Sequence, residues 1–291
     1  MTYQELLRYT QDGLKSAGIE EYKEDAWYLF SECFQMSRSS YFVKNTEPVA
    51  AEYEKEKQCL QECTKKRMQH IPLQYILGRQ EFMGLEFLVN ENVLIPRFDT
   101  ELLVEEVCKY SEGKRILDVC TGSGCIAVSV AALGKPALVD ALDISADALQ
   151  VAKENAKRLH ADITFYESDL FTDIRGSYDC IVSNPPYIES EQIGELAEEV
   201  AVYEPRLALD GGKDGLDFYR VIITQAKEHL SAGGRIFLEI GCNQGDAVLR
   251  LLDANGYSEG MVKKDYAGLD RVVSAVWKKE NPCRMEEQDV R

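Results

Sequence analysis

Apolar and polar positions alternate in blocks along the C-terminal two thirds of the chain, from about residue 115 onward. Seven blocks have the length and apolar content of buried strands: residues 115–119, 138–142, 162–166, 178–183, 234–240, 257–263 and 271–277. Four blocks between them have helical spacing: residues 124–133, 145–160, 214–230 and 243–254. Alternating strands and helices predict an α/β fold, with a doubly wound, mostly parallel, seven-stranded sheet covered by helices on both faces.

Residues 1–70 carry apolar side chains at helical spacing and predict a small N-terminal helical bundle. Thr2 and Glu5 fit a capping box that starts the first helix. A second helix is expected over residues 22–35, and a third begins near Pro48 and continues to the end of the bundle. The dense charge of the third helix is interpreted as a solvated face.

The pattern changes over residues 71–98, which we interpret as a linker with a β-hairpin. Residues 71–78 are expected to leave the helical conformation, and residues 93–97 to be extended. Gly84 stands at a plausible hairpin turn, because the residues on both sides of it have strand character.

The α/β domain is predicted to span residues 99–278. Asp99 or Thr100 is expected to cap its first helix, because short polar side chains satisfy the free backbone N–H groups at a helix start. Residues 279–291 form a polar tail that is expected to be disordered.

The chain of 291 residues is 45% hydrophobic, which is enough for a folded core, and it has a formal net charge of −17. The charge is uneven: residues 1–90 hold 11 basic and 14 acidic side chains, whereas residues 91–291 hold 22 and 36. The excess of acidic side chains in residues 91–291 would repel a phosphate backbone. This argues against a naked nucleic acid as the substrate.

Nine cysteines are scattered through the expected strands and helices, none of them in a Cys-x-x-Cys pair, and the chain has three histidines. This pattern does not predict a metal site, and reduced, mostly buried thiols are expected. The chain has no run of 18 apolar residues, and its start does not resemble a signal peptide. The protein is therefore expected to be soluble and cytoplasmic, with no membrane partner.

The stretch Asn184-Pro185-Pro186-Tyr187 follows the strand expected at residues 178–183. Neither proline can donate to a sheet, so the strand ends here, and the residue before a proline is held extended. The Asn184 side-chain carbonyl and the Pro185 backbone carbonyl are two acceptors on a stiff frame, and Tyr187 adds an aromatic face. This arrangement suits a planar NH2 group, although a proline-rich turn with an incidental asparagine would have the same sequence.

Three other strand ends carry residues suited to a nucleoside, because ligands of doubly wound sheets bind beyond the carboxyl ends of the strands. The first strand leads into a turn in which Gly122 and Gly124 permit close approach of a ligand to the backbone. Asp143 after the second strand is placed to accept hydrogen bonds from ribose hydroxyls. Asp169 and Leu170 after the third strand are placed to contact an adenine ring. A structural turn, a helix N-cap and a capping turn are the alternative interpretations of these three features.

In chain order, these four strand ends resemble the motifs of the class I S-adenosylmethionine-dependent methyltransferases, which have a Rossmann-like fold. The Asn-Pro-Pro-Tyr stretch is similar to that of members that methylate adenine N6, cytosine N4 or the glutamine side-chain amide. Four further stretches resemble the peptide chain release factor glutamine N5-methyltransferases: residues 74–78, 93–97, 204–209 and 212–217. A helical N-terminal domain joined by a hairpin to the catalytic domain is another feature of that family, and the resemblance covers roughly residues 1–278.

The resemblance implies methyl transfer from S-adenosylmethionine to the side-chain nitrogen (N5) of the glutamine in the Gly-Gly-Gln motif of a release factor. Release factors are then the protein partners, docked by the bundle, with no direct nucleic-acid partner and no metal. Cofactor-binding residues are expected at nine positions: Cys120, Thr121, Gly122, Ser123, Gly124, Asp143, Asp169, Leu170 and Asn184. Substrate-binding residues are expected at four: Asn184, Pro185, Pro186 and Tyr187, with Asn184, Pro185 and Tyr187 as the catalytic ones.

The sequence departs from the family pattern at two points. Cys120 stands where the Gly-rich motif of the family usually has glycine, which affects how closely the backbone can approach the cofactor. The family stretch Arg-Pro-Glu-Thr-Glu is replaced by residues 97–101, Arg-Phe-Asp-Thr-Glu, which conserves the charge but loses a proline.

The residues leave other functions open. A glutamine methyltransferase that acts on a ribosomal protein would have the same receptor for an amide. A DNA or RNA adenine-N6 methyltransferase would share the motif but would need a basic groove, which the charge balance disfavours. A binding module that keeps the cofactor fold without catalysis is disfavoured by the intact Asn184–Tyr187 stretch and Asp143.

Overall fold

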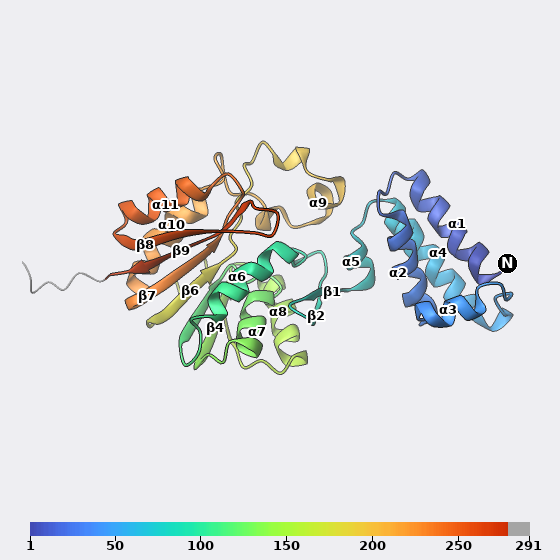
Figure 1. Ribbon diagram of the computed structural model, residues 1–291, viewed down its shortest axis with the longest axis horizontal. Helices are drawn as coiled ribbons and strands as arrows, with labels where there is room; N and C mark the ends of the chain where they lie inside the picture. The colour runs from blue at the N-terminus through green and yellow to red at the C-terminus, as the bar shows by residue number, and fades with distance from the viewer. Residues whose placement is uncertain (279–291) are drawn as a thin grey trace, which may run out of the picture. The chain divides into compact units, whose positions relative to one another are not determined.

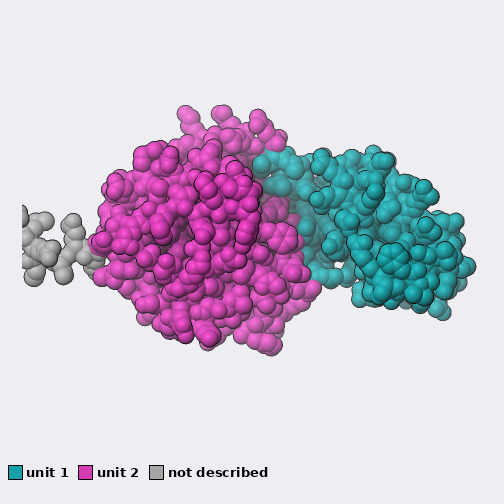
Figure 2. Space-filling view, in the orientation of Figure 1, with its two compact units in different colours: residues 1–79, 196–203 teal, residues 80–195, 204–291 magenta. Residues whose placement is uncertain are grey.

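The computed structural model describes residues 1–278, and the tail predicted at 279–291 lies outside the described residues. The chain divides into two compact units (Figure 2). Unit 1 consists of residues 1–79 together with the short segment 196–203, and unit 2 contains the remaining described residues. The chain therefore leaves unit 2 once, after the Asn184–Tyr187 stretch, and then returns to it.

Unit 1 is built from helices α1 (Tyr3–Ser16), α2 (Tyr22–Phe34), α3 (Arg38–Lys44), α4 (Glu54–Met68), α5 (Leu73–Leu77) and α9 (Glu198–Tyr203), with the 3-10 turn η1 (Ala51–Tyr53) (Figure 1). The predicted capping box is confirmed at the start of α1, where the side chains of Thr2 and Glu5 each accept the backbone N–H of the other residue. The core contains both aliphatic and aromatic side chains, and the rings of Phe30 and Phe34 are stacked with centroids 4.8 Å apart.

Two short helices of this region were not predicted. The chain leaves α4 after Met68, as expected, but Leu73–Leu77 form a further helix, α5, which ends at Gly78 with a left-handed φ of 72°. The apolar side chains of α5 pack against the unit 1 core, and this packing outweighs its short length. The short helix α3 was also missed, because its seven residues contain no buried side chain to give a pattern.

The segment 196–203 is held in unit 1 by a buried arginine. The Arg67 guanidinium lies 2.6 Å from the Asp25 carboxylate and 2.8 Å from the Glu199 carboxylate of α9. Burial raises the pKa of Asp25, and the hydrogen bond from Arg67 opposes that rise. A buried ion pair of this kind fixes one arrangement of the helices, because removing one partner would leave the other charge unpaired.

Unit 2 contains a seven-stranded sheet with the strand order β5-β4-β3-β6-β7-β9-β8. The strands are β3 (Arg115–Val119), β4 (Leu138–Asp143), β5 (Thr164–Glu167), β6 (Tyr178–Ser183), β7 (Leu230–Glu239), β8 (Tyr257–Lys264) and β9 (Asp270–Trp277). Strand β9 runs antiparallel to both of its neighbours, and the other pairs are parallel. The predicted α/β class with a mostly parallel, seven-stranded sheet is confirmed.

Helices cover both faces of this sheet (Figure 1). Helices α6 (Phe98–Cys108), α7 (Cys125–Leu133) and α8 (Ala146–Arg158) pack on one face, and α10 (Asp217–His229) and α11 (Gly245–Ala254) on the other. Successive strand residues point to opposite faces, so Ile116 belongs to the first layer and Leu117 to the second. Both layers are apolar, which explains why the central strands are continuous hydrophobic runs.

The entrance to unit 2 is a hairpin of β1 (Arg79–Phe82) and β2 (Leu85–Leu88). Its turn lies at Met83 and Gly84, both with positive φ, as the position of Gly84 led us to expect. The prediction for the first helix was wrong in detail: α6 begins at Phe98, and its N-cap is Arg97, whose side chain makes no capping hydrogen bond. Thr100 lies inside the helix and is free for another role.

Two 3-10 turns, η2 (Ile193–Glu195) and η3 (Arg206–Ala208), flank α9 in the long connection between β6 and α10. Among the described residues, none of the helices has both the length and the apolar content needed to span a membrane.

Candidate functional site

A pocket opens in unit 2 at the edge of the sheet where the parallel strands end. Together with its mouth it contains about 1080 Å³ of space. Nine of the predicted site residues line it: Cys120, Thr121, Gly122, Ser123, Asp143, Asp169, Leu170, Asn184 and Pro186. The register of the sheet brings them together, since Val119 of β3 is paired with both Leu142 of β4 and Ser183 of β6.

The turn after β3 has an unusual backbone. Cys120 has a φ of 62° and Gly122 a φ of 54°, so both lie in the left-handed region. Glycine adopts this region freely, whereas a residue with a side chain is strained there by about 1–2 kcal/mol. Cys120 therefore adopts the backbone conformation that glycine would adopt. Cysteine in place of the glycine that is usual in the family leaves the backbone strained at the pocket wall.

Asp143 ties this turn to the end of β4. Its two carboxylate oxygens accept hydrogen bonds from the backbone N–H groups of Gly122, at 2.8 Å, and Ser145, at 2.9 Å. Burial raises the pKa of Asp143, and the two backbone hydrogen bonds oppose that rise. A carboxylate has about four acceptor positions, so two remain for a ligand in the pocket.

Gly124 does not line the pocket. It is the N-cap of α7 with a φ of 80°, and a Cβ atom at this position would lie 3.1 Å from the Cβ of Ala152 in α8. The role that the structure gives Gly124 is close packing of two helices, which holds the turn against the sheet.

A buried carboxyl group supports the turn from below. Asp118 is completely buried, and its Oδ2 accepts hydrogen bonds from the Thr121 hydroxyl at 2.6 Å and the Ala127 backbone N–H at 3.2 Å. Burial raises the pKa of Asp118 to about 7, although both hydrogen bonds lower it. Asp118 thus fixes the turn to the first residues of α7 without facing the pocket.

The end of β5 contributes one exposed carboxylate and one strained residue. The Asp169 side chain is exposed, and among the described residues its carboxylate accepts no hydrogen bond. Leu170 has a φ of 48°, which turns its backbone so that its carbonyl accepts the Ser168 hydroxyl at 2.7 Å. Strain at a pocket wall is typical of residues whose position matters for a ligand.

Asn184 is oriented by a residue that is distant in the sequence. Its side-chain Nδ2 donates to the Thr100 hydroxyl oxygen at 3.2 Å, and Thr100 is almost completely buried in α6. The Thr100 hydroxyl also lies near the Glu239 carboxyl group at the end of β7 and lowers its pKa. The Asn184 carbonyl oxygen is left for the pocket.

Glu239 is buried, and burial raises its pKa to about 7, while Thr100, Arg271 and Tyr187 lower it. The Tyr187 hydroxyl donates to Glu239 Oε1 over a long distance of 3.5 Å. One carboxyl group therefore connects Asn184, through Thr100, to Tyr187.

Pro185 and Tyr187 do not line the pocket, although both flank residues that do. Pro185 is buried, and the Tyr187 ring packs against the core between the sheet and α10. The Tyr187 backbone carbonyl accepts a hydrogen bond from Gln244 Nε2 at 3.0 Å. The stretch is thus anchored on its far side, with Asn184 and Pro186 toward the pocket.

Gly211 packs closely against the backbone of the Asn184–Tyr187 stretch. A Cβ atom on Gly211 would lie 2.7 Å from Tyr187 Cα and 2.9 Å from the Pro186 carbonyl oxygen. Backbone atoms cannot yield easily, so only glycine fits at position 211 without moving the Asn184–Tyr187 stretch. Gly211 directly precedes residues 212–217, one of the stretches that resemble the release factor methyltransferases, and was not itself noted from the sequence.

The opposite wall of the pocket comes from two loops that are far apart in the chain. One contains Pro96 and Arg97 and the other Pro205 and Leu207, and an ion pair between Arg97 and Glu204 joins them. Both loops lie within stretches that resemble the release factor methyltransferases.

Three functional residues were not found from the sequence: Thr100, Glu239 and Gly211. Thr100 was interpreted only as a helix cap, and Glu239 was one acid among 50. The available signal was a glutamate at the end of an otherwise apolar strand, at the same sheet edge as Asn184.

The pocket fits a nucleoside cofactor. Carboxylates stand at the ends of β4 and β5, the turn after the neighbouring strand β3 lets a ligand approach the backbone, and apolar residues such as Ile144 and Phe218 complete the wall. An acidic and apolar lining of this kind suits an adenosine group that carries a positive charge.

Comparison with known proteins gives matches over most of the chain. Residues 5–78 match the model of the PrmC N-terminal domain, and residues 97–213 match that of the methyltransferase small domain. A release factor glutamine methyltransferase from Geobacter sulfurreducens is 39% identical, and the match covers 94% of this chain and 95% of that protein. A second release factor glutamine methyltransferase, from Clostridium acetobutylicum, is 41% identical, and the match covers 90% of this chain and 94% of that protein.

Solved structures agree on the fold. A methyltransferase from Pyrococcus furiosus superimposes with a TM-score of 0.54 and 17% identity, over 68% of this chain and 91% of that chain. At this identity the likeness establishes the class I methyltransferase fold of unit 2.

Proposed function

Since this chain belongs to the family of release factor glutamine methyltransferases, we propose that its pocket methylates the side-chain nitrogen of a glutamine in a peptide chain release factor. The methyl donor is S-adenosylmethionine, and the glutamine is that of the Gly-Gly-Gln motif. The observation that carries this function is the orientation of Asn184, whose carbonyl oxygen is left for the pocket by the hydrogen bond to Thr100.

The cofactor half of the site is formed by the ends of β3, β4 and β5. S-adenosylmethionine supplies, when bound, an activated methyl group on a positively charged sulfur. Asp143 would hold ribose hydroxyls with the acceptor positions that Gly122 and Ser145 leave open. Asp169 would accept from a polar edge of the base, and Leu170 would pack beside it.

The substrate half of the site must activate a poor nucleophile. The lone pair of an amide nitrogen is delocalised into its carbonyl, so the nitrogen must be aimed and made more electron-rich. Asn184 Oδ1 would accept one N–H bond of the glutamine side chain in the pocket, and the carbonyl of Pro185, which adjoins the pocket between Asn184 and Pro186, would accept the other. The nitrogen lone pair would then point toward the cofactor. Fixed acceptors of this kind contribute mainly by positioning and by electrostatic preorganisation.

Tyr187 and Glu239 act as positioning residues in this proposal. Tyr187 holds the end of the stretch through its backbone carbonyl and its packed ring, and Glu239 lies beside Thr100 and accepts from Tyr187. The described residues of the pocket include no strong base near Asn184, so the proton of the methylated amide is released to water.

The direct test replaces Asn184 with alanine. The affinity for S-adenosylmethionine, measured by calorimetry, should stay near that of the wild type, whereas methyl transfer to the release factor should fall by about 10²–10³-fold. Transfer near the wild-type rate would remove Asn184 from its role.

We further propose that unit 1 docks the release factor. Helix α3 exposes two apolar side chains, Phe42 and Val43, which are 70% and 77% accessible. Exposed apolar residues of this kind are suited to contact a protein partner. In the double variant Phe42→Ser, Val43→Ser, the KM for intact release factor should rise while the affinity for the cofactor stays constant. An unchanged KM would rule out docking by α3.

A further inference from the structure

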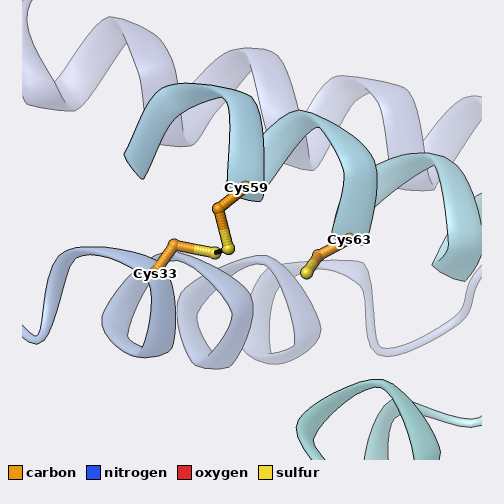
Figure 3. Close-up of side chains that lie close together, drawn as sticks. All are labelled: Cys33, Cys59 and Cys63. Carbon is orange, nitrogen blue, oxygen red and sulfur yellow. Dashed lines mark hydrogen bonds between the residues drawn. The ribbon is translucent and has the colours of Figure 1, made fainter. Parts of the chain in front are cut away.

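Three cysteines of unit 1 converge between two of its helices. Cys33 comes from α2, and Cys59 and Cys63 come from α4 (Figure 3). Cys59 and Cys63 are four residues apart, so they lie on the same face of α4 and point toward α2. The three thiols face one another where α2 packs against α4.

The spacing of the three sulfur atoms fits a shared ligand. All three Sγ atoms lie within 4.8 Å of one another, and Cys33 Sγ lies 2.9 Å from Cys59 Sγ. Zinc–sulfur bonds of about 2.3 Å in a tetrahedron set the sulfur atoms about 3.8 Å apart. A cation at the centre would require the close pair to separate by about 0.9 Å, which a small side-chain rotation provides. Cys59 is exposed and has the room to make it.

The charges around the group favour one thiolate at neutral pH. The hydrogen bond from Cys33 lowers the pKa of Cys63 to about 6, and the charge of Lys66 contributes in the same direction, against burial and Glu62. Burial raises the pKa of Cys59, and the hydrogen bond to Cys63 raises that of Cys33. A bound cation would displace the protons of the thiols that it coordinates.

We propose that Cys33, Cys59 and Cys63 form a binding site for one thiophilic d10 cation, with Zn²⁺ and Cd²⁺ as the experimental probes. Thiolates select cations of this class over Mg²⁺ and Ca²⁺. Within residues 1–278 no further Cys, His, Asp or Glu joins the group, so water would occupy the fourth position. Three thiolates and a divalent cation leave one negative charge, which lies beside Lys66.

The site would join α2 to α4 as a crosslink. Both helices belong to the small N-terminal bundle, and a domain of this size is stabilised considerably by one additional crosslink. A cation that binds the folded state and not the unfolded chain stabilises the fold by mass action. The bundle should therefore unfold at a higher temperature with the cation than without it.

A disulfide between Cys33 and Cys59 is the competing use of the same atoms. It would employ two of the three thiols, leave Cys63 without a function, and require an oxidant. A shared cation employs all three thiols as they converge and needs no redox partner.

The test uses the full chain, reduced and freed of metal. Titration with Cd²⁺ should produce a thiolate-to-cadmium charge-transfer band that saturates at one equivalent. Cys33→Ser and Cys63→Ser should each weaken this binding by more than the 10–100-fold that is typical of losing an outer-shell partner. The matched control is Cys242→Ser, which removes an exposed thiol of unit 2 and should titrate like the wild type.

Thermal unfolding gives a second readout, in which Zn²⁺ should raise the unfolding temperature of the wild type and of Cys242→Ser but not that of Cys63→Ser. If a serine variant does not fold, X-ray absorption of the cadmium-loaded wild type decides, since it counts the sulfur ligands. Absence of saturable binding, binding unchanged in Cys33→Ser and Cys63→Ser, or a stable Cys33–Cys59 disulfide that excludes the cation would each overturn the proposal.

Discussion

The orientation of Asn184 depends on a single hydroxyl group, and Thr100→Val tests that dependence. Valine has nearly the shape of threonine, so the packing of α6 is preserved while the acceptor for Asn184 Nδ2 is lost. The Asn184 amide is then no longer fixed with its carbonyl oxygen toward the pocket, and it can also turn its NH2 group toward the substrate. The substrate amide would then meet a donor where the transfer requires an acceptor.

The size of the effect follows from the hydrogen bond that is lost. A hydrogen bond of this kind contributes about 0.5–1.5 kcal/mol net, and a polar group left unsatisfied costs about 1–3 kcal/mol. At 1.4 kcal/mol for each factor of ten, kcat should fall by roughly 5- to 100-fold. This loss is smaller than that of Asn184→Ala, because a misoriented asparagine still samples the productive orientation.

The assay is single-turnover methyl transfer to the release factor at saturating S-adenosylmethionine. Thr100→Ser keeps the hydroxyl and should retain most of the rate. In the double variant Asn184→Ala, Thr100→Val, the second change should add almost nothing, because both residues act through one contact. A Thr100→Val rate equal to wild type, or full additivity in the double variant, would refute the reasoning.

Three further variants probe the framework of the site. Burial raises the pKa of Glu239 from 4.5 to about 7, so the folded state keeps a proton that the unfolded chain releases, and stability falls as the pH rises from about 4.5 to 7. Glu239→Gln should remove this part of the pH dependence and raise the unfolding free energy at pH 8 by up to about 3 kcal/mol. Urea titrations at pH 5 and pH 8 measure this effect, and an unfolding free energy that still falls between these pH values as in the wild type would contradict it. Gly211→Ala should displace the backbone of Tyr187 and lower the rate of methyl transfer at least about tenfold, with the cofactor affinity unchanged. The reason is that a displacement of about 1 Å in an active site can lower the rate about a hundredfold. A normal kcat would show that the backbone moves without loss of function. Cys120→Gly should relieve backbone strain and change the unfolding free energy by less than about 1 kcal/mol, because the flexibility of glycine in the unfolded chain offsets the relief, whereas Cys120→Val should destabilise by more; equal values for the two would exclude strain at this turn.

The strands and helices of unit 2 were predictable because each follows from a local pattern. The buried strands are continuous apolar runs, and the helices between them carry apolar residues at regular helical spacing. Both patterns can be read from neighbouring residues without knowledge of tertiary contacts. The strand-end positions were predictable for the same reason, since parallel strands place their carboxyl ends at one edge.

The interactions that orient the site were not predictable, because they join residues with no local relation. Asn184 and Thr100 are 84 positions apart, and the proximity of Gly211 to Tyr187 requires the path of the whole connection after β6. Packing also decided the form of α5, whose five residues would not hold a helix alone.

The cysteines of unit 1 show the same limit. Spacing along the chain separates Cys33 from Cys59 by 26 residues, and no Cys-x-x-Cys pair marks a site. Only the antiparallel packing of two helices makes one group of three thiols, so a rule based on sequence spacing does not find it.

Mass spectrometry of a release factor after incubation with this protein and S-adenosylmethionine tests the central claim most directly. The account predicts one added methyl group on the glutamine of the Gly-Gly-Gln peptide, formed about 10²–10³-fold more slowly with Asn184→Ala and absent when that glutamine is replaced. Methylation of a ribosomal protein or of DNA in the same mixture, with the release factor unmodified, would contradict it.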